Sequence, residues 1–177
     1  MKRTNCLFLV TVLLCLALPG LAAKRPNVIL MMADDLGYET LSANGGTPYK
    51  TPHLDKLAAN GLRFTNCVSQ PVCTPTRVKI MTGRYNFRNY KTFGILDPRE
   101  KTLGHVMRDA GYKTCIVGKW QLGCDRKLPG HFGFDEYCLW WLENKSSRYG
   151  NVGELIQNGK VLPGGKGEYG PDVVSAF

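Results

Sequence analysis

The sequence predicts an α/β fold in which a mostly parallel β-sheet is flanked by helices. Three observations lead to this fold class. Residues 27–33 form an apolar run without alternation, which is typical of a strand buried on both faces of a parallel sheet. Further along the chain, segments with strand character alternate with segments that have helix start and stop residues. The length of 177 residues suits one domain with its own core.

The first half of the chain contains clear helix boundaries. Thr51 is a suitable N-cap, Pro52 suits the first helical position, and Gly61 can end the helix. We expect the following elements in this half: a strand at residues 27–33, a helix from Pro52 to Gly61, a strand at residues 62–68, and a short helix from Pro75 to Gly83.

The second half continues the same alternation of helices and strands. Thr102 can cap a helix whose apolar residues have helical spacing, and Gly111 can end it. The pair Asn158-Gly159 between apolar residues predicts a β-hairpin. We expect the following elements: a helix from Thr102 to Gly111, a strand at residues 112–117, another at residues 132–140, the hairpin, and an amphipathic helix that begins near Asp172.

The first 23 residues predict an export signal. Lys2 and Arg3 form a basic start, residues 7–18 are apolar, and residues 21–23 offer a cleavage site with small residues. The apolar segment is too short to span a bilayer comfortably, and a short anchor is the alternative. We therefore expect residues 1–23 to be a signal peptide and residues 24–177 to form an exported domain, periplasmic or secreted, without a stable membrane anchor.

The chain is basic, with a formal charge of +9. Removal of Lys2 and Arg3 with the signal leaves +7, because residues 1–23 contain no acidic residue. A basic surface suits an anionic substrate such as a sulfated glycan, and it suits solubility equally well. We find no nucleic-acid-binding module and expect no nucleic-acid partner.

Seven cysteines are present, of which five follow the predicted signal. Export permits disulfides, and an odd number leaves one thiol over. No spacing among these cysteines is typical of a zinc site. The five are Cys67, Cys73, Cys115, Cys124 and Cys138.

Polar residues follow the predicted strands. Asp34 and Asp35 come after the first strand, Cys73 follows the second by a short loop, and Lys119 follows the third. In open parallel sheets, ligands bind outside the carboxyl ends of the strands, so these side chains could share one cleft. Two adjacent carboxylates suit a hard divalent cation such as calcium or magnesium, although a turn or an N-cap is the alternative.

Cys73 begins the most informative motif, Cys-Thr-Pro-Thr-Arg, which ends at Arg77 and is followed by Thr82-Gly83. A cysteine near a helix N-terminus can be a reactive thiolate, and a buried structural cysteine is the other alternative. A Cys-His hydrolase is poorly supported, because the three histidines are scattered and suit surface or capping positions. They are His53, His105 and His131.

From Lys24 onward the chain resembles the N-terminal portion of the formylglycine-dependent sulfatases, which are arylsulfatase-like members of the alkaline-phosphatase-like superfamily. The match of residues 71–77, with residues 80–83, to the first family signature is highly specific. Other matching motifs are spread over nearly all of residues 24–177: residues 27–30 with 34–37, 51–55, 111–114 with 117–120, and 133–137.

This resemblance implies a sulfuric ester hydrolase that acts on a sulfated small molecule or glycan. Cys73 would be oxidised to formylglycine by a maturation enzyme, and Arg77 would orient and stabilise it. Asp34 and Asp35 would bind calcium together with the modified residue 73. Lys119 would contact the sulfate.

The chain departs from the family in two ways. Gln121 stands where the family often has histidine, and an amide can donate a hydrogen bond to a sulfate oxygen but cannot transfer a proton at neutral pH. The family is also much longer, with further metal and sulfate ligands beyond the position of Phe177, so we expect a truncated chain that is inactive alone. A phosphonate or phosphate monoester hydrolase with the same chemistry and an inactive fragment are the alternatives.

Overall fold

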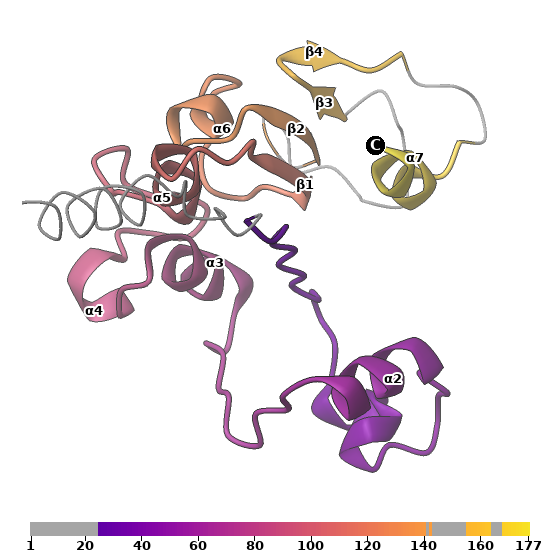
Figure 1. Cartoon of the computed structure of the whole chain (residues 1–177). Coiled ribbons are helices and arrows are strands. Elements are labelled where there is room, and N and C mark those ends of the chain that lie inside the picture. Colours follow the sequence, from indigo (N-terminus) through magenta and orange to yellow (C-terminus); the bar gives the residue numbers. More distant parts are fainter. Residues whose placement is uncertain (1–24, 141, 143–154, 164–167) are drawn as a thin grey trace, which may run out of the picture. The chain divides into compact units, whose positions relative to one another are not determined.

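The computed structural model describes residues 25–140, 142, 155–163 and 168–177 (Figure 1). The chain divides into two compact units, of which one ends at Pro52 and the other runs from His53 to Phe177. The predicted signal peptide and its cleavage site lie outside the described residues. In the described part of the first unit, two short 3-10 helices form, η1 at Tyr38–Thr40 and η2 at Ser42–Asn44.

Two predicted strands are wrong. Neither residues 27–33 nor residues 62–68 form a β-strand, and nearly all of their side chains are exposed, as Ile29 at 83% and Phe64 at 72% illustrate. A strand is stabilised by hydrogen bonds to a neighbouring strand, and among the described residues neither run has such a neighbour. An apolar run therefore indicates that a segment tends to be buried, but it does not show that a neighbouring strand is present for the segment to pair with.

The predicted helices are largely confirmed. α2 begins at Pro52, and Thr102 caps α5, where the Thr102 hydroxyl accepts from the His105 N–H while the His105 ring accepts from the Thr102 N–H. This contact confirms a capping role for one of the three histidines. The α-helices are α2 (Pro52–Asn60), α3 (Cys73–Thr82), α4 (Asn86–Asn89), α5 (Leu103–Asp109), α6 (Leu128–His131) and α7 (Gly170–Ala176).

Helix α3 begins two residues earlier than predicted. Cys73 rather than Pro75 is its first residue, and Gly83 is its C-cap, which agrees with the expected end of the helix. Gly83 has a left-handed backbone with φ of 64°, and its N–H donates to the carbonyl of Lys79 at 2.9 Å. This is the usual glycine stop of an α-helix, and it is readable from the sequence.

A four-stranded mixed sheet confirms the α/β class. Its order is β1-β2-β3-β4; β1 pairs with β2 in parallel, and the β2–β3 and β3–β4 pairs are antiparallel. The predicted hairpin is confirmed, since Asn158 and Gly159 join β3 and β4 with φ of 48° and 84°. The strands are β1 (Cys115–Lys119), β2 (Glu136–Trp140), β3 (Ile156–Gln157) and β4 (Lys160–Val161).

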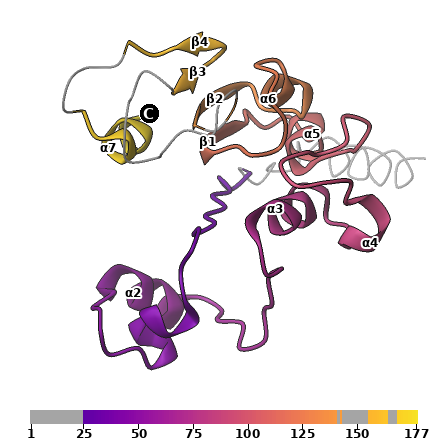
Figure 2. The same cartoon turned by 180° about the vertical axis from the view of Figure 1, so that it is seen from behind.

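The strand predicted at residues 132–140 is shorter in the structure. It begins at Glu136, because the chain first forms α6 and then a turn at Gly133 with φ of 94°. α6 lies in the crossover between the parallel strands β1 and β2. α3 packs against α4 and α5, and α7 contacts β1 (Figure 1, Figure 2).

One hydrophobic core holds these elements together. Trp120 and Phe132 are fully buried, and their ring centroids lie 6.0 Å apart. Val78 and Met81 extend this core from α3, and Leu139 from β2. The core therefore connects the helix that begins at Cys73 with the strands of the sheet.

Reciprocal hydrogen bonds join the residues directly before β1 and β2, which are Thr114 and Asp135. The Thr114 N–H donates to Oδ2 of Asp135 at 3.0 Å, and the Asp135 N–H donates to Oγ1 of Thr114 at 3.0 Å. The hydrogen bond from the Thr114 backbone lowers the pKa of Asp135 below its ordinary value. Two of the sequence motifs, residues 111–114 and 133–137, thus meet in a structural contact that sets the register of the parallel pair.

Candidate active site

The loop before Cys73 folds back onto the first turn of α3. The Gln70 N–H donates to Oγ1 of Thr76 at 3.1 Å, and the Thr76 hydroxyl lies 3.0 Å from the carbonyl of Val72. Val72 is extended, and Cys73 is the half-buried first residue of the helix. The sequence therefore places the cysteine at the positive end of a ten-residue helix, where a negative charge is stabilised.

The residues after Cys73 anchor a second loop. Thr74 is fully buried, and its Oγ1 accepts a hydrogen bond from the Gly94 N–H at 3.0 Å. The carbonyl of Pro75 accepts one from Nδ2 of Asn86 at 2.9 Å. Arg77 is half-buried and follows Cys73 by four residues, a spacing that puts both on one face of the helix.

Lys119 ends strand β1. Its side chain is buried, and Nζ lies 5.7 Å from the centroid of the Trp140 ring, the residue that pairs with it on β2. A cation over an aromatic face is attracted by the ring quadrupole. The aromatic ring is thus one contact that holds the ammonium group at the carboxyl end of the parallel pair.

Gln121 is the most unusual residue of the loop that follows β1. It is 1% exposed, its φ is 52°, and among the described residues neither Nε2 nor Oε1 of its amide has a hydrogen-bond partner. A left-handed backbone disfavours residues other than glycine, and an unsatisfied buried amide costs about 1–3 kcal/mol. Strain and unmet hydrogen bonding at one residue are typical of a site whose partner is a ligand.

One segment bridges the start of α3 and the loop after β1. The Gly94 N–H donates to Thr74, and the Leu96 N–H donates to the carbonyl of Leu122 at 3.3 Å. Thr74 follows Cys73 directly, and Leu122 follows Gln121 directly. The second unit therefore contains Cys73, Arg77, Lys119 and Gln121, with the neighbours of Cys73 and Gln121 tied to the same short segment.

Asp34 and Asp35 belong to the first unit, where they follow no strand. Asp34 is half-buried, and Asp35 is exposed with a left-handed φ of 55°. In the part of the chain that the structure describes, no three His, Cys, Asp or Glu side chains form a group that could hold a metal ion. Two carboxylates suit calcium because calcium prefers oxygen ligands. That Asp34 and Asp35 converge with residue 73 on one cation stays a prediction.

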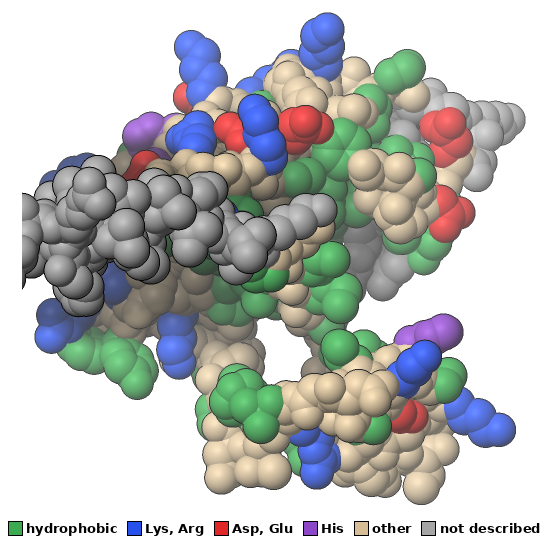
Figure 3. All heavy atoms as spheres, viewed as in Figure 1, with side chains coloured by type: hydrophobic (Ala, Val, Ile, Leu, Met, Phe, Trp, Pro, Cys, Tyr) green, Lys and Arg blue, Asp and Glu red, His purple; other side chains and the backbone are tan. Residues whose placement is uncertain are grey.

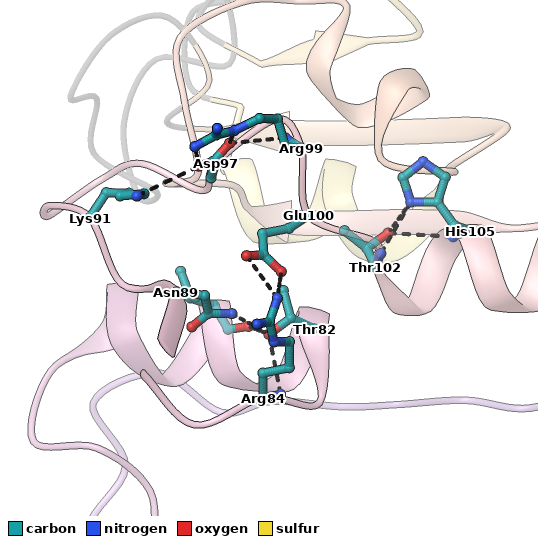
Figure 4. Close-up of polar contacts among 10 residues, drawn as sticks. Thr82, Arg84, Asn89, Lys91, Asp97, Arg99, Glu100, Thr102 and His105 are labelled. Atoms are coloured by element: carbon teal, nitrogen blue, oxygen red, sulfur yellow. Dashed lines mark hydrogen bonds and ion pairs between the residues drawn. The ribbon is translucent and has the colours of Figure 1, made fainter. Parts of the chain in front are cut away.

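Sequence reasoning missed a polar network that fastens the loop between α3 and α5 (Figure 4). Nη1 of Arg84 contacts both carboxylate oxygens of Glu100, at 3.1 and 2.8 Å, and Nδ2 of Asn89 donates to Oγ1 of Thr82 at 2.9 Å. Hydrogen bonding by Arg99 holds the pKa of Asp97 well below its usual range. No local pattern reveals this network, because Arg84 and Glu100 are 16 residues apart.

This chain is similar in sequence to known proteins. The sequence model of the family "Sulfatase" matches residues 26–169. Arylsulfatase A of Bos taurus is 43% identical over 139 residues, with 72% of this chain and 27% of that protein covered. Steryl-sulfatase of Rattus norvegicus is 37% identical over 145 residues, with 70% and 25% covered.

Solved structures give the same result. One similar structure was determined in complex with its substrate D-glucosamine-2-N,6-O-disulfate. It is 30% identical with a TM-score of 0.71, and the match covers 86% of this chain and 30% of that chain. The structure of Ps i-CgsB is 27% identical with a TM-score of 0.74, and the shares covered are 86% of this chain and 40% of that one. The chain thus spans about a quarter of the length of the curated relatives cited above.

No helix in the described part of the chain is long and apolar enough to cross a membrane.

Proposed function

Because this chain belongs to the sulfatase family, we propose that the protein is a sulfuric ester hydrolase whose nucleophile is a formylglycine made from Cys73. The observation that carries this proposal is the position of Cys73 as the first residue of α3, within the sequence Cys-Thr-Pro-Thr-Arg. A helix N-terminus favours the negative charge that develops on an attacking oxygen and on a sulfate ester.

The chemistry follows from what an aldehyde at residue 73 can do. Its hydrate carries two hydroxyls on one carbon. One hydroxyl oxygen attacks sulfur, the bond from sulfur to the ester oxygen breaks, and the alcohol leaves with a proton. The second hydroxyl then loses its proton, the carbonyl re-forms, and sulfate leaves. A thiol or a serine hydroxyl lacks this second route for releasing the adduct.

The other residues of the site would act on charge and position. Lys119 would place an ammonium group beside the sulfuryl oxygens, and Arg77 would orient residue 73. Gln121 would donate a hydrogen bond from Nε2 to a sulfuryl oxygen, which would satisfy its buried amide. Since an amide does not titrate near neutral pH, Gln121 would contribute no proton transfer.

Calcium would be held by Asp34, Asp35 and the oxygen of the modified residue 73. When bound there, it would supply the positive charge that makes the attacking hydroxyl more acidic. Adjacent carboxylates at these two positions are the feature of this chain that suits such an ion.

The remaining proposals concern partners and location. The substrate would be a sulfated small molecule or glycan, and one structurally similar protein was solved with a disulfated glucosamine as its substrate. A formylglycine-generating enzyme would act on Cys73 during maturation. The basic start and apolar stretch of residues 1–23 support export to the periplasm or secretion.

The test is to produce the full-length protein with and without a formylglycine-generating enzyme and to examine the peptide that contains residue 73 by mass spectrometry. Turnover of an aryl sulfate and of an aryl phosphonate is then compared, with Cys73→Ala as control. We expect conversion of Cys73, turnover of the sulfate that depends on conversion, and none in the variant. An unmodified thiol in a preparation that converts a control sulfatase would contradict the proposal. Preferential turnover of the aryl phosphonate would favour a phosphonate hydrolase instead of a sulfatase.

A further inference from the structure

An exposed aromatic and basic surface lies on and beside α4. It consists of the half-buried Lys79 and the exposed Tyr85, Phe87 and Arg88, and is called the α4 platform. Tyr85 is 64% exposed and Phe87 is 82% exposed. In the space-filling view, hydrophobic side chains lie beside Lys and Arg side chains in the region of α4 (Figure 3). Exposed apolar side chains that lie next to one another and are rimmed by polar groups are typical of interaction surfaces.

The platform is ordered by its own contacts. The rings of Tyr85 and Phe87 are inclined by 16° with centroids 6.1 Å apart, so they lie nearly parallel. Nζ of Lys79 lies 5.2 Å from the Tyr85 centroid, and Cζ of Arg88 lies 5.5 Å from the Phe87 centroid. The order of the four residues is thus cation, ring, ring and cation. Much of both rings remains exposed to solvent.

The charge of the platform selects an anionic partner. Within the described residues, neither Lys79 nor Arg88 forms an ion pair with a carboxylate, in contrast to the neighbouring Arg84, which pairs with Glu100. The other four basic residues of the segment 79–101 each pair with a carboxylate, of Glu100, Asp97 or Asp109. A partner that carries several negative charges would therefore be attracted to this surface.

The platform is attached to the turn that begins with Cys73. Asn86 stands between Tyr85 and Phe87 in the sequence, and its Nδ2 donates to the carbonyl of Pro75, two residues after Cys73. The same loop returns at Gly94 to bind Oγ1 of Thr74. The platform is thus joined by hydrogen bonds to the first turn of α3, in which Cys73 is the first residue.

We infer that the α4 platform binds further sugar residues of a sulfated polysaccharide whose sulfate ester reaches residue 73. Sugar rings have apolar faces that stack on aromatic side chains, while sulfate groups bind lysine and arginine through charge-assisted hydrogen bonds. The inference rests on the proposed sulfatase activity for its substrate class. Binding to the platform, however, is measurable without turnover.

A membrane fits the platform less well than a sulfated polysaccharide, and a single-stranded nucleic acid fits it in part. A membrane-binding helix needs an extended apolar face, and α4 has four residues. A single-stranded nucleic acid binds through stacked bases and cations, and it shares part of this chemistry. Both are therefore arms of the experiment.

The experiment uses the full-length protein with Cys73→Ala, which prevents turnover. Dissociation constants are measured for hexasaccharides of heparin, chondroitin sulfate and carrageenan, for their desulfated forms, for anionic lipid vesicles, and for a single-stranded oligonucleotide. Phe87→Ala and Arg88→Gln are then introduced separately. The matched controls are Tyr49→Ala, another exposed aromatic residue, and Lys113→Gln, another exposed lysine. Thermal unfolding confirms that each variant is folded.

We expect binding of at least one sulfated hexasaccharide and much weaker binding of its desulfated form. Phe87→Ala and Arg88→Gln should each raise that dissociation constant about ten-fold, as expected for the loss of a stacking contact or a charge-assisted hydrogen bond. The controls should stay within about two-fold, because exposed residues outside the contact contribute little.

Several outcomes would overturn the inference: no binding of any sulfated hexasaccharide, equal binding of the desulfated forms, equal effects of the control variants, or binding of vesicles or the oligonucleotide alone. The proposed function is tested separately by conversion of Cys73 and by turnover of an aryl sulfate. Its failure would leave the binding result intact.

Discussion

Replacement of Gln121 by leucine should make the protein more stable and less active. The Gln121 side chain is fully buried, and its amide has no hydrogen-bond partner among the described residues. A leucine of similar size removes both unsatisfied polar atoms while it keeps the same left-handed backbone strain. The relief corresponds to about 1–3 kcal/mol in the free energy of unfolding. For a domain of 150–250 residues, that is a rise of about 2–12 °C in the melting temperature.

Activity should change in the opposite direction. If the Gln121 amide donates to a sulfuryl oxygen in the transition state, its loss removes one preorganised donor. Such a loss lowers kcat by about 10²-fold or more. Added inorganic sulfate should also stabilise the parent protein more than the Gln121→Leu variant, because the variant lacks a ligand contact.

The assay combines thermal unfolding, with and without sulfate, and turnover of an aryl sulfate by the full-length, converted protein. Thr114→Val is the matched control, since Thr114 is buried and its hydroxyl hydrogen bonds are satisfied by Gly133 and Asp135. The control should lower stability by about 1–3 kcal/mol. A Gln121→Leu variant that is less stable than its parent, or that keeps full activity, would refute the reasoning.

Three further predictions concern packing, pH and metal. Gly133→Ala should destabilise the protein by about 2–4 kcal/mol, because an added Cβ would clash with the backbone of α5 and φ is 94°; a loss below about 1 kcal/mol in denaturant unfolding would contradict this. The lowered pKa of Asp135 contributes stability above its unfolded pKa that is lost as pH falls through the folded value. Asp135→Asn should therefore be less stable at pH 7, with a difference that shrinks toward pH 2; a constant difference would argue against it. Asp34→Ala and Asp35→Ala should each abolish stabilisation of the full-length protein by calcium, as followed by melting temperature, and undiminished stabilisation would exclude them as ligands.

Local chemistry allowed much of the fold to be predicted. Thr102 and Pro52 mark helix starts, Gly83 marks a helix end, and Asn158-Gly159 marks a hairpin, because each depends on backbone preferences within a few residues. The α/β class followed from the alternation of such segments. The two wrong strands, at residues 27–33 and 62–68, show the limit of this reasoning, since strand formation requires a partner that no local pattern specifies.

The sequence by itself determined the family, because residues 26–169 match the sulfatase family. The motif from Cys73 to Arg77 predicts the reactive position. Gln121 could be recognised as a departure from the family, but its sequence position says nothing of its burial or its backbone strain.

Only the tertiary structure decided which distant residues meet. It joined Thr74 to Gly94 and Leu96 to Leu122, and these hydrogen bonds tie the start of α3 to the loop after β1. Such contacts link residues through the packing of a shared core, and their geometry depends on every element that the core holds in place rather than on the spacing of residues along the chain.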